Sequence, residues 1–171
     1  GGIVGALDQI MSGSIDRAFC LTRPPGHHAS PTRGMGFCIF NHAAVAARHA
    51  QSVHGVGKVL VVDWDVHHGN GTQDIFYEDE SVYFFSTHQA PWYPGTGSRE
   101  ETGSGTGLGF TRNHPLPSGS GNAEIVENAF ADDLVHRMNR YRPELVIISA
   151  GFDSKIGDPL GQFQLTDDDF S

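Results

Sequence analysis

Two hydrophobic patterns alternate along the chain, and they predict strands and helices. Short continuous apolar runs are typical of strands buried on both faces, and they predict strands at residues 18–21, 58–62, 82–86, 110–116 and 145–149. Apolar residues spaced three or four positions apart predict helices at residues 3–11, 37–49, 72–77 and 122–141. The second helix should close near Gly55, and the last should end before Pro143. This alternation predicts an α/β fold, a parallel sheet with helices on both faces.

Polar side chains follow three of the predicted strands directly. His27 and His28 come after the first strand, Asp65 and His67 after the second, and Asp153 after the last. Ligands of parallel α/β sheets bind outside the carboxyl ends of the strands. We therefore expect these five side chains to meet at one edge of the sheet.

The densest of these clusters lies in residues 63–71, where two aspartates and two histidines stand within six positions. Asp65 and His67 are two residues apart, so in an extended backbone they point to the same side. A carboxylate and an imidazole there suit a borderline cation such as Zn²⁺, although Fe²⁺ or Co²⁺ would also accept them. The alternative is that these residues, His27, His28 and Asp153 only cap turns or helices.

A long glycine-rich loop, residues 88–109, carries Trp92 and Tyr93 between two prolines. Loops of this length without secondary structure are usually functional or disordered. The aromatic pair favours a functional loop.

Composition narrows the possible classes of protein. With 38 % hydrophobic residues in 171, the chain can form one globular domain. A formal charge of −9 argues against a nucleic-acid partner and is compatible with a basic one. No apolar run approaches membrane length, so no membrane partner is expected. Cys20 and Cys38 lack paired-motif spacing, which predicts reduced, mostly buried thiols in a cytoplasmic protein.

Five motifs in order resemble the histone deacetylase superfamily, and most closely its bacterial class II deacetylase-like amidohydrolases. They lie at residues 23–29, 36–38, 63–71, 94–97 and 149–153. The resemblance implies the arginase-deacetylase fold, a three-layer α/β/α sandwich with a mainly parallel sheet. Residues 1–171 would form a partial catalytic domain that is incomplete at both ends.

The resemblance also implies a role for each polar residue of the site. Asp65, His67 and Asp153 match the zinc ligands of the family. Zinc would polarise the acetyl carbonyl and lower the pKa of its bound water. His28 matches the general base and acid, and His27 matches its electrostatic partner.

Two further residues would orient these histidines. Asp63 would hold the ring of His27, and Asn70 falls where the partner of His28 belongs. That position is Asp in some relatives, and an amide would leave His28 less basic.

Substrate contacts and potassium sites follow from the same resemblance. Gly36, Phe37 and either Trp92 or Tyr93 would line a narrow tunnel for the acetyl-lysine stem, although core packing explains the aromatic residues equally well. One potassium site would use Asp63, Ser86 and main-chain oxygens of Asp65, His67 and Thr87. The second would use main-chain oxygens near Phe76, Asp79, Val82 and Phe110.

The family completes its site with a Tyr or His that follows the Asp153 motif at a distance, and none of the four tyrosines here matches it. We therefore expect a piece of a longer protein, weakly active or inactive by itself.

Several functions are compatible with this sequence. The first is a zinc amidohydrolase acting on acetylated lysine in peptides or proteins; an acetylpolyamine amidohydrolase and a non-catalytic binding module are the alternatives. A ureohydrolase of arginase type is disfavoured, because no Asp stands two residues after His67. The oligomeric state is not predicted.

Overall fold

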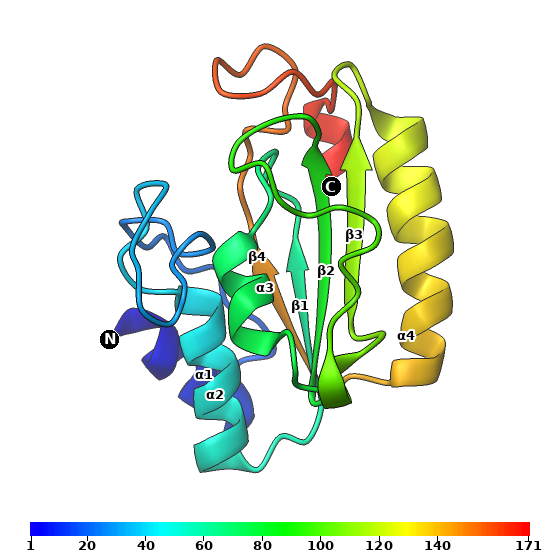
Figure 1. The fold of residues 1–171 in the computed structure, drawn as a ribbon. Helices are drawn as coiled ribbons and strands as arrows, with labels where there is room; N and C mark the ends of the chain where they lie inside the picture. Colours follow the sequence, from blue (N-terminus) through cyan, green and yellow to red (C-terminus); the bar gives the residue numbers. More distant parts are fainter.

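A computed structural model describes residues 1–171 and shows a four-stranded parallel sheet between helical layers (Figure 1). The strand order is β3-β2-β1-β4. The strands are β1 (Val59–Asp63), β2 (Val82–Gln89), β3 (Thr111–Leu116) and β4 (Leu145–Ser149). All three neighbouring pairs are parallel, which confirms the predicted sheet.

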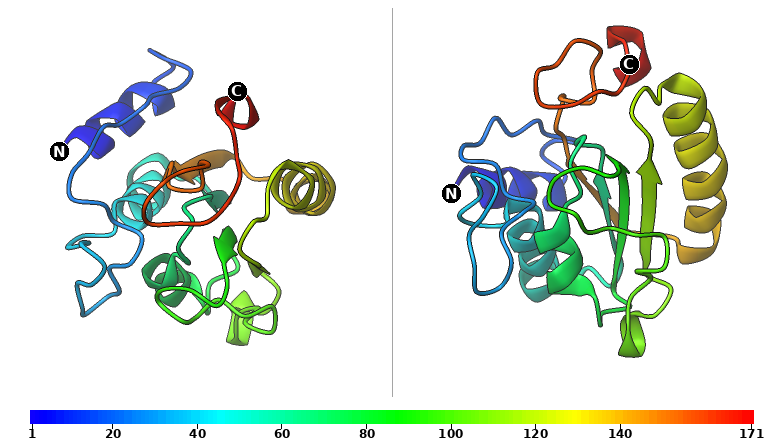
Figure 2. Two further views of the ribbon diagram at one scale, coloured as in Figure 1. Left: turned by 90° about the horizontal axis from the view of Figure 1, so that it is seen from above. Right: turned by 45° about the horizontal axis from the view of Figure 1, so that its top comes forward.

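Helices cover both faces of the sheet, as the two views of Figure 2 show. The helices α1 (Gly2–Met11), α2 (His42–His54) and α3 (Asn70–Phe76) lie on one side. On the other side lies one continuous helix, called the helical rod below. It is a π-helix over Ala123–Leu134 (η2) and an α-helix over Val135–Tyr141 (α4). Single turns of 3₁₀-helix occur at Gly105–Gly107 (η1) and Asp167–Phe170 (η3).

Alternating side chains of the central strands fill the two cores. Val59 and Val61 of β1 pack with α1, α2 and α3, whereas Leu60 and Val62 pack with η2 and α4. Successive strand residues point to opposite faces, so a continuous apolar run is required where both faces are covered. The three-layer arrangement follows from this pattern.

The ends of α2 are set by its capping residues. The Asn41 side chain accepts a hydrogen bond from the Ala44 amide, and Gly55 closes the helix with φ of 71°. The predicted start at residue 37 was therefore too early, because residues 37–40 lie before the cap. No helix of the chain is long and apolar enough to cross a bilayer.

The predicted strand at residues 18–21 is wrong. This segment is irregular and exposed, with Phe19 69 % and Leu21 89 % accessible to solvent. Both edges of β1 are already occupied, by β2 and β4, so the segment has no edge of that strand to join. Cys20 is exposed with it, whereas Cys38 is buried, so only one of the two free thiols is buried as predicted.

The strand β4 is less buried than its sequence predicted. Val146 and Ile148 are about half exposed, whereas every residue of β1 and β2 is buried. Leu145 and Ile147 pack on the core beneath α1 and α2, while the helical rod packs on residues of β1 and β2 instead. One face of β4 is therefore open to solvent.

Asp133 ties β3 to the helical rod. Its carboxylate accepts hydrogen bonds from Arg112 Nε (2.6 Å), His114 Nε2 (2.8 Å) and Arg137 Nε (2.8 Å). Burial opposes ionisation of Asp133, but these three donors lower its pKa below the usual value. This contact gives the buried His114 ring a polar partner.

We expect Asp133→Ala to destabilise the chain by about 1–3 kcal/mol, because it leaves partly buried Arg112 and His114 without their acceptor. Urea unfolding should show a lower midpoint with an unchanged slope. The control Asp132→Ala removes an exposed carboxylate from the next position and should change stability by less than about 0.5 kcal/mol. Equal midpoints for the two variants would show that the Asp133 cluster contributes nothing.

Candidate metal and catalytic site

The three predicted metal ligands converge at the carboxyl edge of the sheet. His67 Nδ1 lies 2.9 Å from Asp65 Oδ1 and 3.0 Å from Asp153 Oδ2, and the three potential ligand atoms lie within 4.8 Å of one another. About one sixth of each side chain is accessible to solvent. The cluster is therefore preformed and open on one side, as a catalytic metal site must be.

Backbone contacts hold both carboxylates in this arrangement. Asp65 Oδ1 accepts from the His67 amide (2.8 Å), and Asp153 Oδ1 accepts from the Val66 amide (2.9 Å). A Cβ on Gly151 would overlap the Asp65 carboxylate, so only glycine fits at that position. The turns after β1 and β4 are thus built around the carboxylate pair.

The electrostatics of the cluster favour a cation. Burial disfavours the charged form of His67, but Asp153 and Asp65 outweigh it and raise its pKa to about 10. Burial likewise opposes ionisation of Asp65, but His27 and His67 lower its pKa to about 2. Two carboxylates and one imidazole form a donor set that Zn²⁺ accepts, so the residues present fit the predicted ion.

The tandem histidines lie beside this cluster and have different partners. His27 Nδ1 is 2.9 Å from Asp63 Oδ2, and His28 Nδ1 is 2.9 Å from Asn70 Oδ1. The Asn70 amide nitrogen donates to Met35 Sδ, so its carbonyl oxygen faces His28. A carbonyl only accepts, so His28 carries its proton on Nδ1 and leaves Nε2 free.

These partners shift the two pKa values in opposite directions. Burial opposes the charged form of His27, but the carboxylates of Asp63 and Asp65 raise its pKa to about 9. For His28, burial and the neighbouring His27 lower the pKa to about 4. The ring centroids are only 4.0 Å apart, so a cationic and a neutral imidazole lie side by side.

The prediction that His27 and His28 follow a strand is wrong, because the segment before them is irregular. Instead, the Thr72 amide donates to the His27 carbonyl (3.1 Å), and the His28 amide donates to Cys38 Sγ (3.4 Å). A side chain at Gly71 would collide with the backbone of Ala29. The loop is therefore positioned by the start of α3.

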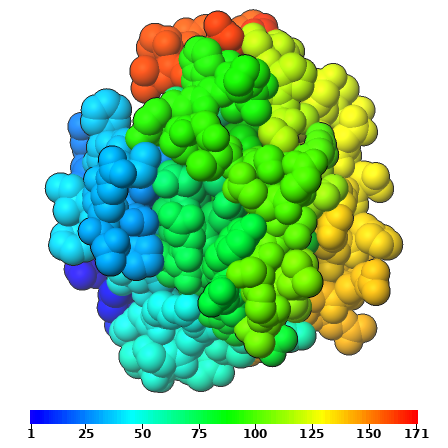
Figure 3. All heavy atoms as spheres, viewed as in Figure 1, coloured from blue at the N-terminus to red at the C-terminus, as the bar shows by residue number.

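Of the predicted tunnel residues, Tyr93 and Gly36 lie at the site. The Tyr93 ring stands edge-on to His28, with centroids 5.1 Å apart, and 6.2 Å from the His67 ring. A Cβ on Gly36 would overlap the His28 ring. Trp92 instead donates to the Leu160 carbonyl (2.9 Å), and the Phe37 side chain is 86 % exposed. Figure 3 shows the green segment after β2 beside the blue segment before α2, the two loops that carry these residues.

The two predicted potassium sites differ in their surroundings. Asp63 and Ser86 are register partners on β1 and β2, and both are fully buried, with Thr87 next to them. In the second set, the Phe76, Asp79 and Phe110 carbonyls accept the amides of Asp79, Val82 and Phe84. Only the first site would use a side-chain carboxylate, that of Asp63, because the second would use main-chain oxygens alone.

Sequence reasoning missed the polar network that anchors the Tyr93 loop. The Glu101 carboxylate accepts from the amides of Gly97 (3.1 Å) and Ser98 (3.0 Å) and from Gln73 Nε2 (2.6 Å). His68 joins the same network through Thr96 and Gln73. The only sign of this network in the sequence is an acidic residue, Glu101, within a glycine-rich loop, and the sequence does not indicate which residues it binds.

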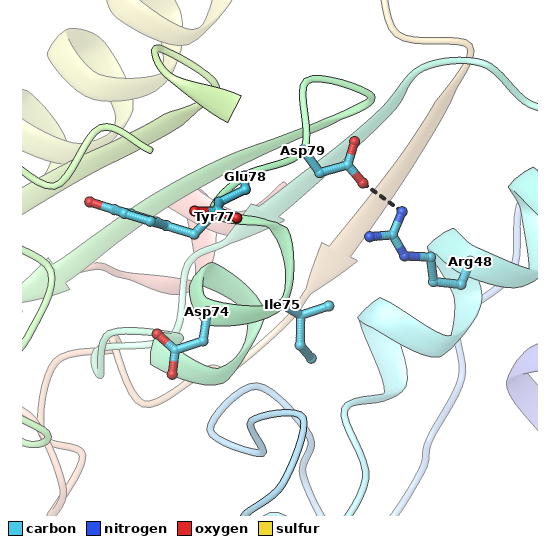
Figure 4. A pocket seen from close by; sticks show the side chains of 6 residues that line it. All are labelled: Arg48, Asp74, Ile75, Tyr77, Glu78 and Asp79. Atoms are coloured by element: carbon cyan, nitrogen blue, oxygen red, sulfur yellow. Dashed lines mark hydrogen bonds and ion pairs between the residues drawn. The ribbon is translucent and has the colours of Figure 1, made fainter. Parts of the chain in front are cut away.

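A separate surface hollow contains none of the metal or histidine residues. It has a volume of about 590 Å³ and is open to solvent, and it lies between α2 and the end of α3 with the residues that follow α3 (Figure 4). Its only interaction between lining side chains is the Arg48–Asp79 ion pair (2.6 Å). Of the predicted site residues, it includes Asp79 alone.

Comparison with known proteins places this geometry in a family. The sequence profile described as "Histone deacetylase domain" matches residues 1–171. "Histone deacetylase 14, chloroplastic" of Arabidopsis thaliana is 49 % identical over 148 residues, which cover 86 % of this chain and 35 % of that protein. "Histone deacetylase-like amidohydrolase" of Pseudomonas aeruginosa is 43 % identical over 168 residues, with coverages of 98 % and 44 %. "Polyamine deacetylase HDAC10" of Homo sapiens is 45 % identical over 171 residues, with coverages of 96 % and 25 %.

A solved structure agrees with these relatives. The "Crystal Structure of HDA15 HD domain" superposes with a TM-score of 0.94 at 44 % identity, covering 98 % of this chain and 48 % of that one. The chain therefore spans less than half the length of each of these proteins. Since the family profile matches its whole length, this chain belongs to the histone deacetylase domain family.

Proposed function

We propose that the chain forms the metal-binding part of a zinc-dependent deacetylase, a hydrolase that removes acetyl groups from acylated amines. The observation that carries this proposal is the open cluster of Asp65, His67 and Asp153 beside the free Nε2 of His28. Family membership supports the reaction class. Zinc, when bound by these three ligands, would supply Lewis-acid polarisation of the acetyl carbonyl and of water.

The residues of the chain would manage the protons. A neutral His28 can accept a proton at Nε2 from the attacking water and return it to the leaving amine. His27, held by Asp63, places a positive charge against the reacting centre and orients Asp65, whose Oδ2 is 3.7 Å from His27 Nε2. Asn70 fixes the tautomer of His28 through its carbonyl.

The proposed substrates are acetylated lysine in a peptide or protein, or an acetylated polyamine. An acetylated polyamine keeps its other ammonium groups, and such a cation suits a chain with a formal charge of −9. A relative whose printed name is a polyamine deacetylase supports the second class. Potassium binding near Asp63 and Ser86 and a cytoplasmic location belong to the same proposal.

Removing one metal ligand tests the function directly. With Zn²⁺ supplied, the chain should hydrolyse an acetyl-lysine peptide or an N-acetylated polyamine only slowly, because none of its tyrosines matches the oxyanion donor of the family. Asp153→Ala should lower this turnover by at least about a hundredfold, because the ion loses a ligand. Released acetate is the measured product. The control Asp168→Ala removes an exposed carboxylate and should leave turnover unchanged. Turnover equal in the chain and in Asp153→Ala would contradict this metal ligand, and a folded, zinc-loaded chain that binds the peptide without hydrolysing it would be a binding module or an incomplete catalyst.

Changing Asn70 to Asp tests the role of His28. A carboxylate 2.9 Å from Nδ1 favours the charged imidazole, so the pKa of His28 should rise by about 1–3 units from its lowered value. Only neutral His28 can accept a proton, so activity is lost as pH falls through this pKa. The acidic limb of the kcat/KM profile should therefore move to higher pH by the same amount. An unmoved limb would contradict His28 as the base.

Truncating the aromatic residues tests the tunnel. Tyr93→Ala should raise KM about tenfold, because the ring that would contact the methylene stem of acetyl-lysine is lost beside His28. Trp92→Ala is the matched comparison, since that indole faces the Leu160 carbonyl, and its KM should change less. A larger rise in KM from Trp92→Ala than from Tyr93→Ala would show that Trp92, and not Tyr93, lines the tunnel.

A further inference from the structure

A second cluster of possible metal ligands lies on the helical layer formed by α1 and α2. His49 Nε2 and His54 Nε2 each lie 2.7 Å from Asp8 Oδ1, and the three ligand atoms lie within 4.8 Å of one another. The two histidines come from successive turns near the end of α2, and Asp8 comes from α1. Like the site at the sheet edge, this cluster combines imidazole and carboxylate ligands, but it has two imidazoles and one carboxylate instead of one imidazole and two carboxylates.

The contacts of Asp8 differ from those of a structural ion pair in the same molecule. Asp133 is paired with two arginines as well as a histidine, so its charge is already compensated by permanent cations. Asp8 has only the two imidazoles, which are neutral metal ligands when deprotonated. Its charge is therefore available to an ion.

We infer that Asp8, His49 and His54 form a second divalent transition-metal site, best suited to Zn²⁺. A tetrahedral ion with bonds of about 2.0–2.1 Å places its ligand atoms about 3.3 Å apart, so the 2.7 Å contacts must open by about 0.6 Å. The Asp8 side chain is 48 % exposed and can rotate outward, and water can complete the coordination.

The packing beneath the cluster keeps the ligands close to that geometry. Leu7, next to Asp8, is buried in the core that also contains Ala46, Ala47 and Ala50 of α2. The two histidines are about one fifth exposed, so their rings are held in place while the ligand atoms stay accessible. A bound ion would fasten α1 to the end of α2.

This site is separate from the catalytic cluster. Asn41, the N-cap of α2, contacts Ala29 and Thr72 beside the tandem histidines, whereas His54 lies at the opposite end of the helix. The loss of one site should therefore leave the other intact.

Zinc content measured by equilibrium dialysis tests the inference. His49→Ala and His54→Ala should each lower the bound zinc by one ion per chain, both in the otherwise unchanged chain and in the Asp153→Ala variant. The exposed His136 offers a control, and His136→Ala should leave the zinc content unchanged. Unchanged zinc content in the His49→Ala/His54→Ala double variant would overturn the site, whether or not Asp153 is also substituted.

A second measurement does not depend on removing a histidine. In the Asp153→Ala variant, Zn²⁺ at about 100 times its Kd should raise the unfolding temperature by about 5–10 °C, because the ion binds only the folded pair of helices. Asp8→Asn keeps the shape of the side chain but removes its charge, and it should weaken this zinc binding at least tenfold. Equal zinc affinity with and without the Asp8→Asn substitution would show that the carboxylate is not a ligand.

Discussion

The buried carboxylate of Asp63 is the interaction on which the site depends. It ends β1 with no solvent exposure, and it binds His27 Nδ1 with one oxygen and the Asp65 amide with the other. A Cβ on Gly69 would overlap the same carboxylate, so the turn back toward α3 must pass it without a side chain. A buried charge requires partners. Through these partners, Asp63 positions both the histidine loop and Asp65, the first proposed metal ligand.

Because the central strands are buried on both faces, polar site residues can lie only at the ends of the strands. Residues 59–62 of β1 are apolar and packed on both faces, so polar groups become possible only where the strand ends. The register pairs Asp63 with Ser86 on one side and Ser149 on the other, and polar residues therefore begin together on three strands. The proposed metal ligands follow immediately. The apolar core and the polar edge are two consequences of one register.

Features that depend on a local sequence pattern were predicted correctly, whereas features that depend on contacts between distant residues were missed. Strand β4 was predicted with its observed bounds, since five apolar residues before a polar turn define it. The segment at residues 18–21 has the same local pattern but no free strand edge beside β1, which only the assembled sheet reveals. Likewise, Asp65 and His67 are two residues apart and could be recognised together. The contact of Glu101 with Gln73 joins residues 28 positions apart, and no local pattern signals it.

The tandem histidines show how a fold gives adjacent identical residues opposite properties. Both rings are buried and only 4.0 Å apart, so two positive charges there would repel strongly. A carboxylate faces His27, whereas a neutral amide faces His28. The charge therefore settles on His27, and this charge itself helps to keep His28 neutral. Pairs whose environments push their pKa values apart divide acid-base roles between them. Because the difference lies in residues 63 and 70, the opposite pKa shifts of the two histidines are set by the end of β1 and the start of α3 and not by the histidine loop.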